Sequence, residues 1–112
     1  MTYRAVRMPE GVVATVDGEA LCLRLDLVPY SEAFDYGEST NGANQLALAI
    51  LARHLGDRPI FGSVMSGDQH AIASSMQFKW AFIVEAPKDQ PFEITSEQID
   101  EWLAKRGVEV SR

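Results

Sequence analysis

The sequence predicts an α+β fold in which a small, mainly antiparallel sheet of three to four strands packs against a buried central helix and a C-terminal amphipathic helix. Two observations indicate this class. Residues 19–28 alternate between leucine and more polar residues, which is typical of a strand with one buried face. Residues 43–55 are apolar almost all round, which is typical of a helix buried on most sides. The length of 112 residues predicts a single domain, 1–112.

Three strands are expected in the first part of the chain. The first, 3–8, ends at a turn containing Pro9 and Gly11. The second and third, 12–16 and 19–28, are joined at Asp17-Gly18, a pair typical of type I′ hairpin turns. One face of the third strand carries the leucines expected in the core, namely Leu21, Leu23, Leu25 and Leu27.

The second part of the chain alternates between helix and strand signals. Gly56 is expected to end the central helix, and a short helical turn is expected over 69–75. The aromatic and β-branched segment 78–85 predicts a buried strand. Thr95 and Gln98 have the spacing of a capping box, which predicts the start of the last helix, 96–106. Its buried face would carry Ile99, Trp102, Leu103 and Arg106.

The charge balance excludes some functions and favours others. Ten Lys and Arg against 16 Asp and Glu give a net charge of −6, and residues 25–52 contain no Lys or Arg. Direct nucleic-acid binding is disfavoured, because phosphate contacts need a basic surface. The acidity fits a protein partner with a basic surface, or it serves only to keep the protein in solution.

Other patterns limit the compartment and the cofactors. No apolar stretch approaches the ~20 residues of a membrane helix, and no signal peptide is recognisable, so a cytoplasmic location is expected. The single cysteine, Cys22, fits a reducing compartment. One cysteine with His54 and His70 does not make a zinc site of the usual kind, and no metal or other cofactor is expected.

A run of motifs resembles a known family. An aromatic, Gly- and Ser-containing loop over 34–44 leads into Gln45-Leu46-Ala47-Leu48-Ala49-Ile50-Leu51-Ala52, and further along stand Gly56-Asp57, Phe78-Lys79, and Thr95 with Ile99. This order resembles a family of small bacterial domains of unknown function over roughly residues 3–103. The resemblance implies an accessory protein of phages, plasmids or integrated elements, with no established activity.

The loop before the central helix is the best candidate for a functional site. Its small polar residues lie where the first free N–H groups of a helix could hold an anion, or where they simply cap the helix. Its aromatic residues form either an interface or a lid over the core, and Tyr36 is the one expected to be exposed. The residues expected to contact a partner are Tyr30, Glu32, Asp35, Tyr36, Glu38, Ser39, Thr40, Asn41 and Asn44.

Few residue patterns typical of enzymes are present in the sequence. Ser66, Asp68 and His70 can be combined into a triad, but no nucleophile-elbow sequence accompanies them. Cys22 stands near Arg24, which could lower the pKa of a thiol, yet a small packed residue is the plainer interpretation. The chain is therefore not expected to be an enzyme, and a small hydrolase is the weakest of the hypotheses.

The sequence-based hypothesis is a non-enzymatic interaction protein of a phage or mobile element. Its acidic loop would occlude a basic site on a larger protein, as an inhibitor of host defence of the anti-CRISPR kind would do. The alternative is a small-ligand or nucleotide-binding domain that uses the N-terminus of the central helix. Exposed strand edges also make a homodimer plausible.

Overall fold

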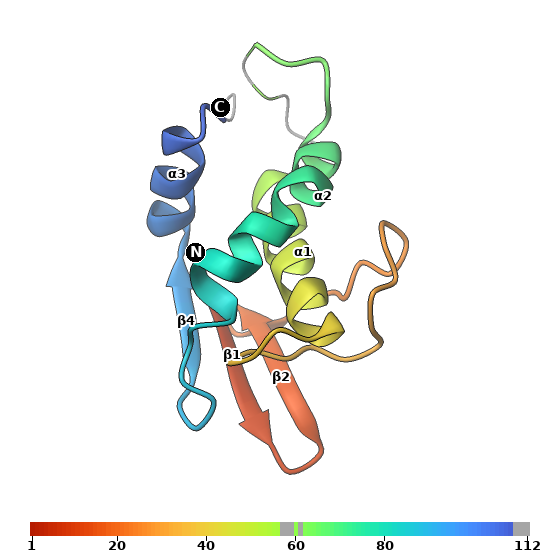
Figure 1. Cartoon of the computed structure of the whole chain (residues 1–112), viewed down its shortest axis with the longest axis vertical. Helices are drawn as coiled ribbons and strands as arrows, with labels where there is room; N and C mark the ends of the chain where they lie inside the picture. The colour runs from red at the N-terminus through yellow and green to blue at the C-terminus, as the bar shows by residue number, and fades with distance from the viewer. Residues whose placement is uncertain (57–59, 61, 109–112) are drawn as a thin grey trace.

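The computed structural model describes residues 1–56, 60 and 62–108, and its sheet confirms the predicted α+β class. Four antiparallel strands lie in the order β3-β2-β1-β4 (Figure 1). They are β1 (Thr2–Met8), β2 (Gly11–Val16), β3 (Glu19–Ala20) and β4 (Phe92–Thr95). Strands β1, β2 and β4 form one buried face of the sheet, because alternate side chains such as Tyr3 and Ala5 point into the core.

The hairpin between β2 and β3 has the predicted turn. Asp17 and Gly18 both have positive φ, 50° and 84°, as a type I′ turn requires. The strand that follows is much shorter than predicted, so the prediction of a strand over 19–28 is wrong beyond Ala20. Arg24 has a φ of 57°, and the Leu27 N–H donates to the Arg24 carbonyl, so the backbone turns where the strand was expected.

The leucine face of this segment is correspondingly only partly buried. Leu21 is buried, Leu23 and Leu27 are half-buried, and Leu25 is exposed. The alternation of leucines is therefore real in the sequence but does not mark one continuous sheet face. The physical reason is that the segment leaves β2 after Leu21: β3 pairs with β2 through Glu19 and Ala20, and the Leu21 N–H donates to the Ala14 carbonyl.

The central helix α1 (Asn41–Leu55) confirms the prediction of a buried helix. Twelve of its residues are buried, and Gly56 ends it with a φ of 56° and an N–H that donates to the Ala52 carbonyl. Helix α2 (Gly67–Phe78) packs along α1 (Figure 1). It is longer than the predicted helical turn over 69–75. Its start is fixed by a capping box between Ser66 and Gln69.

The prediction of a buried strand over 78–85 is wrong. The backbone passes from α2 into a π-helical segment, η1 (Lys79–Ile83), in which the Val84 N–H donates to the Lys79 carbonyl. Phe78 and Ile83 are buried and Phe82 is half-buried, a spacing of four and five residues that suits a helix, whereas Trp80 is exposed.

The chain ends in β4 followed directly by α3 (Ser96–Lys105). The predicted capping box is confirmed: Thr95 accepts from the Gln98 N–H, and the Gln98 side chain accepts from the Thr95 N–H. Ile99 and Leu103 are buried as expected, while Trp102 is half-buried beneath the guanidinium of Arg106. Strand β4 itself was not predicted.

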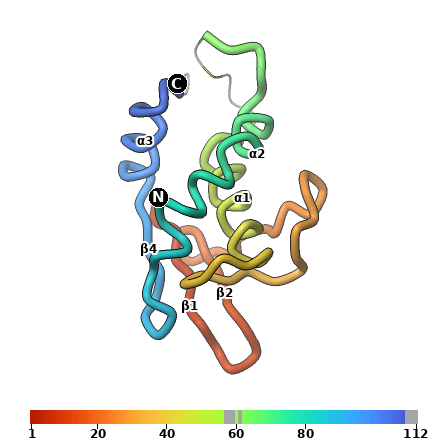
Figure 2. Tube along the Cα trace, viewed as in Figure 1, coloured from red at the N-terminus to blue at the C-terminus, as the bar shows by residue number. Residues whose placement is uncertain are grey.

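Figure 2 follows the chain through the loop that joins β3 to α1, which extends to one side of the helices, with α3 on the other side. The candidate site residues lie on that loop and at the start of α1. Among the described residues, no helix combines the length and apolar character that a bilayer span requires.

Candidate functional site

The loop between β3 and α1 is held in shape by a buried glutamine. The amide Nε2 of Gln45 donates to the Leu23 carbonyl at 2.6 Å, and its Oε1 accepts from the Ser31 N–H at 3.0 Å. Gln45 is completely buried on α1. Its side chain thus ties both ends of the segment 23–31 to the central helix. Sequence reasoning missed this role, although a glutamine within an Ala/Leu-rich helix is a signal for it.

A second tie joins the same loop to α2. The Arg24 guanidinium donates to Asp26 at 3.1 Å and to Asp68 at 3.2 Å. The hydrogen bond to Asp26 raises the pKa of Arg24 most, with a further rise from the hydrogen bond and charge of Asp68 and an opposing effect of burial. Asp68 is the acidic residue in the first turn of α2, so Arg24 fixes the loop to the start of that helix.

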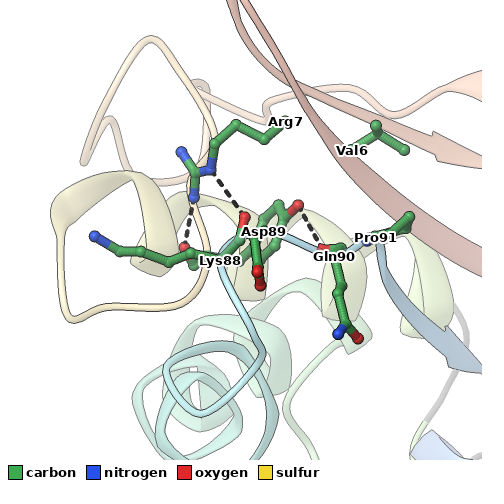
Figure 3. A pocket seen from close by; sticks show the side chains of 7 residues that line it. Val6, Arg7, Lys88, Asp89, Gln90 and Pro91 are labelled. Carbon is green, nitrogen blue, oxygen red and sulfur yellow. Dashed lines mark hydrogen bonds between the residues drawn. The ribbon is translucent and has the colours of Figure 1, made fainter.

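The next part of the loop is held by Arg7 of β1, which forms a clamp with Asp35, Tyr36 and the turn at Lys88. Its Nη2 donates to Asp35 Oδ1 at 3.0 Å and to the Tyr36 carbonyl at 2.8 Å, and its Nε donates to the Lys88 carbonyl at 3.2 Å. Figure 3 shows Arg7 reaching across to the turn at Lys88 and Gln90. The Tyr36 hydroxyl donates to the Gln90 carbonyl at 2.8 Å. One guanidinium therefore joins three segments.

The expectation that Tyr36 is exposed is wrong. Only 1% of the residue is exposed, because its ring lies beneath the Arg7 guanidinium, 5.0 Å from the ring centroid, and against Phe92. Phe34 is also buried and forms a bridge to Val12 of β2, while Tyr30 is half-buried. Of the two alternatives for the aromatic residues, the lid over the core matches the structure.

Asp35 is the electrostatic centre of the clamp. Burial raises the pKa of its carboxyl, but hydrogen bonds from Arg7, the Tyr36 N–H and the Thr40 hydroxyl, together with the charge of Arg7, lower it by more. The net result is a pKa below the usual value for aspartate. Asp35 is therefore an ionised carboxylate with its partners inside the protein.

The N-terminus of α1 is capped by Thr40. The Thr40 hydroxyl accepts from the Ala43 N–H at 3.2 Å and donates to Asp35 Oδ2 at 3.0 Å. The side chain of Lys79, which is 4% exposed, donates from Nζ to Ser39 Oγ at 3.2 Å. Asn41 is exposed and Asn44 half-buried. Capping thus accounts for Thr40, and Ser39 accepts a hydrogen bond from a buried lysine of η1.

A groove opens on the other side of the loop, against the β2–β3 hairpin. It has a volume of about 350 Å³. Its walls are apolar and include Val12, Leu21, Leu23 and Phe34. Two carboxylates, Glu10 and Glu32, stand among its lining residues. Both are exposed, and no basic side chain among the described residues pairs with either. The expected site residue Glu32 belongs to this groove, whereas Glu10 was not foreseen.

The nine expected contact residues therefore do not form one surface. Glu32 lies at the groove, Asp35 and Tyr36 lie in the clamp, and Thr40 caps α1. Glu38 pairs with Lys88 and is exposed. The other four, Tyr30, Ser39, Asn41 and Asn44, are half-buried or exposed around the loop and the helix start.

Comparison with known proteins assigns the family. A family model described as a family of unknown function, DUF6166, matches residues 3–105. The chain belongs to this family. No curated protein and no solved structure matches it. The match confirms the resemblance found in the sequence, and it spans the groove, the clamp and the start of α1. Of the motifs that carried the resemblance, Asp57 lies outside the described residues.

The catalytic candidates of this DUF6166 member do not assemble into a triad. Ser66 caps α2 by accepting from the Gln69 N–H, Asp68 pairs with Arg24, and His70 Nε2 lies 2.9 Å from Ser63 Oγ. Cys22 is exposed and free. Asp100, half-buried on α3, lies 2.7 Å from Nε2 of the buried His54. Across residues 1–56, 60 and 62–108, no three side chains cluster in a way that could hold a metal ion.

Proposed function

We propose that this protein is a non-enzymatic interaction protein whose groove binds a basic segment of a protein partner. The supporting observation is the pair Glu10 and Glu32, which line an apolar groove without a cationic partner among the described residues. Some other surface carboxylates are paired, whereas exposed ones such as Glu85 and Glu97 also lack a salt bridge within the described residues but do not line the groove. Arg4 pairs with Glu93, Lys88 with Glu38, and Lys105 with Glu101.

The chemistry of the groove defines the ligand. Its apolar walls, including Leu21 and Phe34, favour an apolar side chain that leaves water on binding. Carboxylates at its edge favour Lys or Arg on either side of that anchor. The ligand is therefore an exposed segment with an apolar residue next to basic residues. The loop that forms one wall is already held by Gln45 and Arg24, so little order has to be gained on binding.

Occlusion is the mechanism that follows from such binding. A protein with a net charge of −6 that takes a basic segment into its groove covers the positive surface on which that segment lies. The roles expected from the sequence, an accessory protein of a phage or mobile element and an inhibitor of host defence, are specific forms of this proposal. A reducing, cytoplasmic setting belongs to it as well, since the sole cysteine, Cys22, is free.

Peptide display tests the proposal without knowledge of the natural partner. A random peptide library is selected on the folded protein and counter-selected on the Glu10→Gln/Glu32→Gln variant. Selected peptides are expected to carry an apolar residue flanked by Lys or Arg, and to bind the variant roughly tenfold less tightly at low salt. The matched control is Glu85→Gln/Glu97→Gln, which removes the same charge from exposed positions outside the groove.

Two results would overturn the proposal. Enrichment of neutral or acidic peptides would show that the groove does not select a basic segment. Equal binding to the groove variant and to the control variant would show that only the net charge matters, or that peptides bind elsewhere.

The alternative, a small ligand at the start of α1, stays a prediction. Lys79 places a positive charge at Ser39, and the Asp35 carboxylate that binds Thr40 is already paired with Arg7, so the charges at this end of the helix do not exclude an anion. Thermal unfolding with inorganic phosphate is the direct measurement. A rise in melting temperature that depends on phosphate concentration would favour this alternative.

A further inference from the structure

Lys79 is buried, and its charge is not paired in the described part of the chain. Only 4% of the residue is exposed, and its Nζ donates to Ser39 Oγ at 3.2 Å and lies 4.8 Å from the centroid of the Trp80 ring. A hydroxyl and an aromatic ring stabilise an ammonium but do not neutralise it. Within residues 1–56, 60 and 62–108, no carboxylate forms an ion pair with this lysine. Buried charges are normally paired, so the site lacks an anion.

The two carboxylates closest to α1 in the preceding loop are already bound to other cations. Asp35 Oδ1 accepts from Arg7 at 3.0 Å, and Glu38 Oε1 lies 2.6 Å from Lys88 Nζ. The lysine of η1 is therefore a third cation beside two carboxylates. The start of α1 carries one positive charge in excess, to which the helix dipole adds.

The start of α1 supplies further donors beside the ammonium. Ser39 Oγ accepts from Lys79, so the proton of its own hydroxyl is available to a ligand. The N–H groups of Asn41 and Gly42, the first two of the helix, donate to no group in the described part of the chain. Ser39 and Asn41 are exposed, so a ligand reaches this point from solvent.

We infer that Lys79, Ser39 and the first N–H groups of α1 bind a phosphate group. A phosphate monoester carries a charge of about −1.5 to −2 at pH 7 and three acceptor oxygens, which match an ammonium, a hydroxyl and helix N–H groups together. The inference names a ligand for the alternative site at the start of α1. It does not rest on the groove, because neither Lys79 nor Ser39 lines it, so each can fail without the other.

Calorimetric titration of the folded chain with inorganic phosphate tests the inference. The wild type is expected to bind one phosphate. Lys79→Met keeps the length of the side chain but removes its charge, so the dissociation constant should rise at least roughly tenfold. Lys105→Met removes the same charge from an exposed side chain of α3 and should bind phosphate like the wild type.

Thermal unfolding provides a second readout. At a phosphate concentration roughly ten times the dissociation constant, the melting temperature of the wild type should rise by about 5 °C. Phosphate also stabilises proteins through exclusion from their surface, which affects all variants alike. The rise that is lost in Lys79→Met and kept in Lys105→Met therefore measures binding at the site.

Ser39→Asp tests the site without removing the lysine. The new carboxylate supplies the missing counter-charge at an exposed position, so the variant should stay folded and bind phosphate at least roughly tenfold less tightly. This result decides the matter even where Lys79→Met does not fold, which circular dichroism checks.

A titration with glycerol 3-phosphate distinguishes the sources of the phosphate group. Binding at least as tight as that of inorganic phosphate identifies a phosphate ester as the ligand, and weaker binding identifies the free ion; both support the inference. A wild type that binds neither compound would overturn it. Equal phosphate binding by Lys79→Met and Lys105→Met, or by Ser39→Asp and the wild type, would overturn it as well.

Discussion

Gln45 is the residue that links the family's helix motif to the shape of the loop. Replacement by methionine keeps the volume but leaves the Leu23 carbonyl and the Ser31 N–H without their partner. The free energy of unfolding is expected to fall by about 2–3 kcal/mol, because two partly buried backbone groups lose their hydrogen bonds. Urea unfolding measures this loss. Gln90→Met, at an exposed side chain, is the control, and an equal loss in both variants would contradict the role of Gln45.

Asp35 provides a prediction about pH. Its pKa is lower in the folded protein than in the unfolded chain, so its carboxylate stabilises the fold above the unfolded value of about 3.9 and loses this effect as the pH falls through the folded value. Asp35→Asn is therefore expected to lower the free energy of unfolding by about 1 kcal/mol at pH 7.

The pH dependence separates this effect from simple loss of packing. The difference in urea unfolding between wild type and Asp35→Asn should shrink below about pH 4, where the wild-type carboxylate gains a proton. A difference that stays constant down to pH 3 would show that the charge of Asp35 contributes nothing. Asp89→Asn, at an exposed carboxylate, should change stability little at either pH.

Single residues were predictable from the sequence when their role is local. The capping box of Thr95 and Gln98 and the Asp17-Gly18 turn depend on neighbours within three residues, so the pattern alone was sufficient. Tyr36 was not predictable in this way. Its burial depends on Arg7 and on the Gln90 carbonyl, which are 29 and 54 residues away in the chain.

At the scale of elements, the two wrong strand predictions have one cause. Both segments, 19–28 and 78–85, carry the composition of a strand, but the first has a strand beside it only as far as Leu21 and the second has none among the described residues. The first is drawn from the sheet edge to α1 by Gln45 and to α2 by Arg24. The second continues from α2, and its backbone hydrogen bonds are made within a π-helical turn. Propensity was overridden by tertiary contacts in both cases.

The contact between the end of α1 and the start of α2 provides a prediction at the scale of elements. A Cβ atom at Gly67 would lie against the Gly56 carbonyl oxygen and 2.9 Å from the Leu55 carbonyl carbon. Both are backbone atoms at the end of α1, so they cannot move aside as a flexible side chain would. Gly67→Ala should lower the free energy of unfolding by about 3 kcal/mol.

Chemical denaturation measures this effect, and Ala73→Ser at an exposed position of the same helix provides the reference. The reference variant should unfold at nearly the wild-type denaturant concentration. If Gly67→Ala does so too, the two helices are not in close contact at this point. The close approach was not visible in the sequence, because it depends on how the end of one helix meets the start of the next.

At the scale of the whole molecule, two carboxylates lie beside an apolar groove. The groove is lined by Glu10 and Glu32 together with apolar side chains. The sequence predicted the net acidity and a basic partner. It did not predict the groove, because residues 10–14 and 32–34, which line it, are brought together only by the fold.

Salt should therefore weaken the binding of a basic segment to the groove. Raising the ionic strength from about 0.05 M to about 0.5 M shortens the distance over which charges act from roughly 14 Å to roughly 4 Å. Binding of a basic peptide to the groove should weaken, because its attraction to Glu10 and Glu32 is screened.

Titration of a selected peptide at both salt concentrations measures this response. Peptide binding that is indifferent to salt would remove the charge-based argument for the groove.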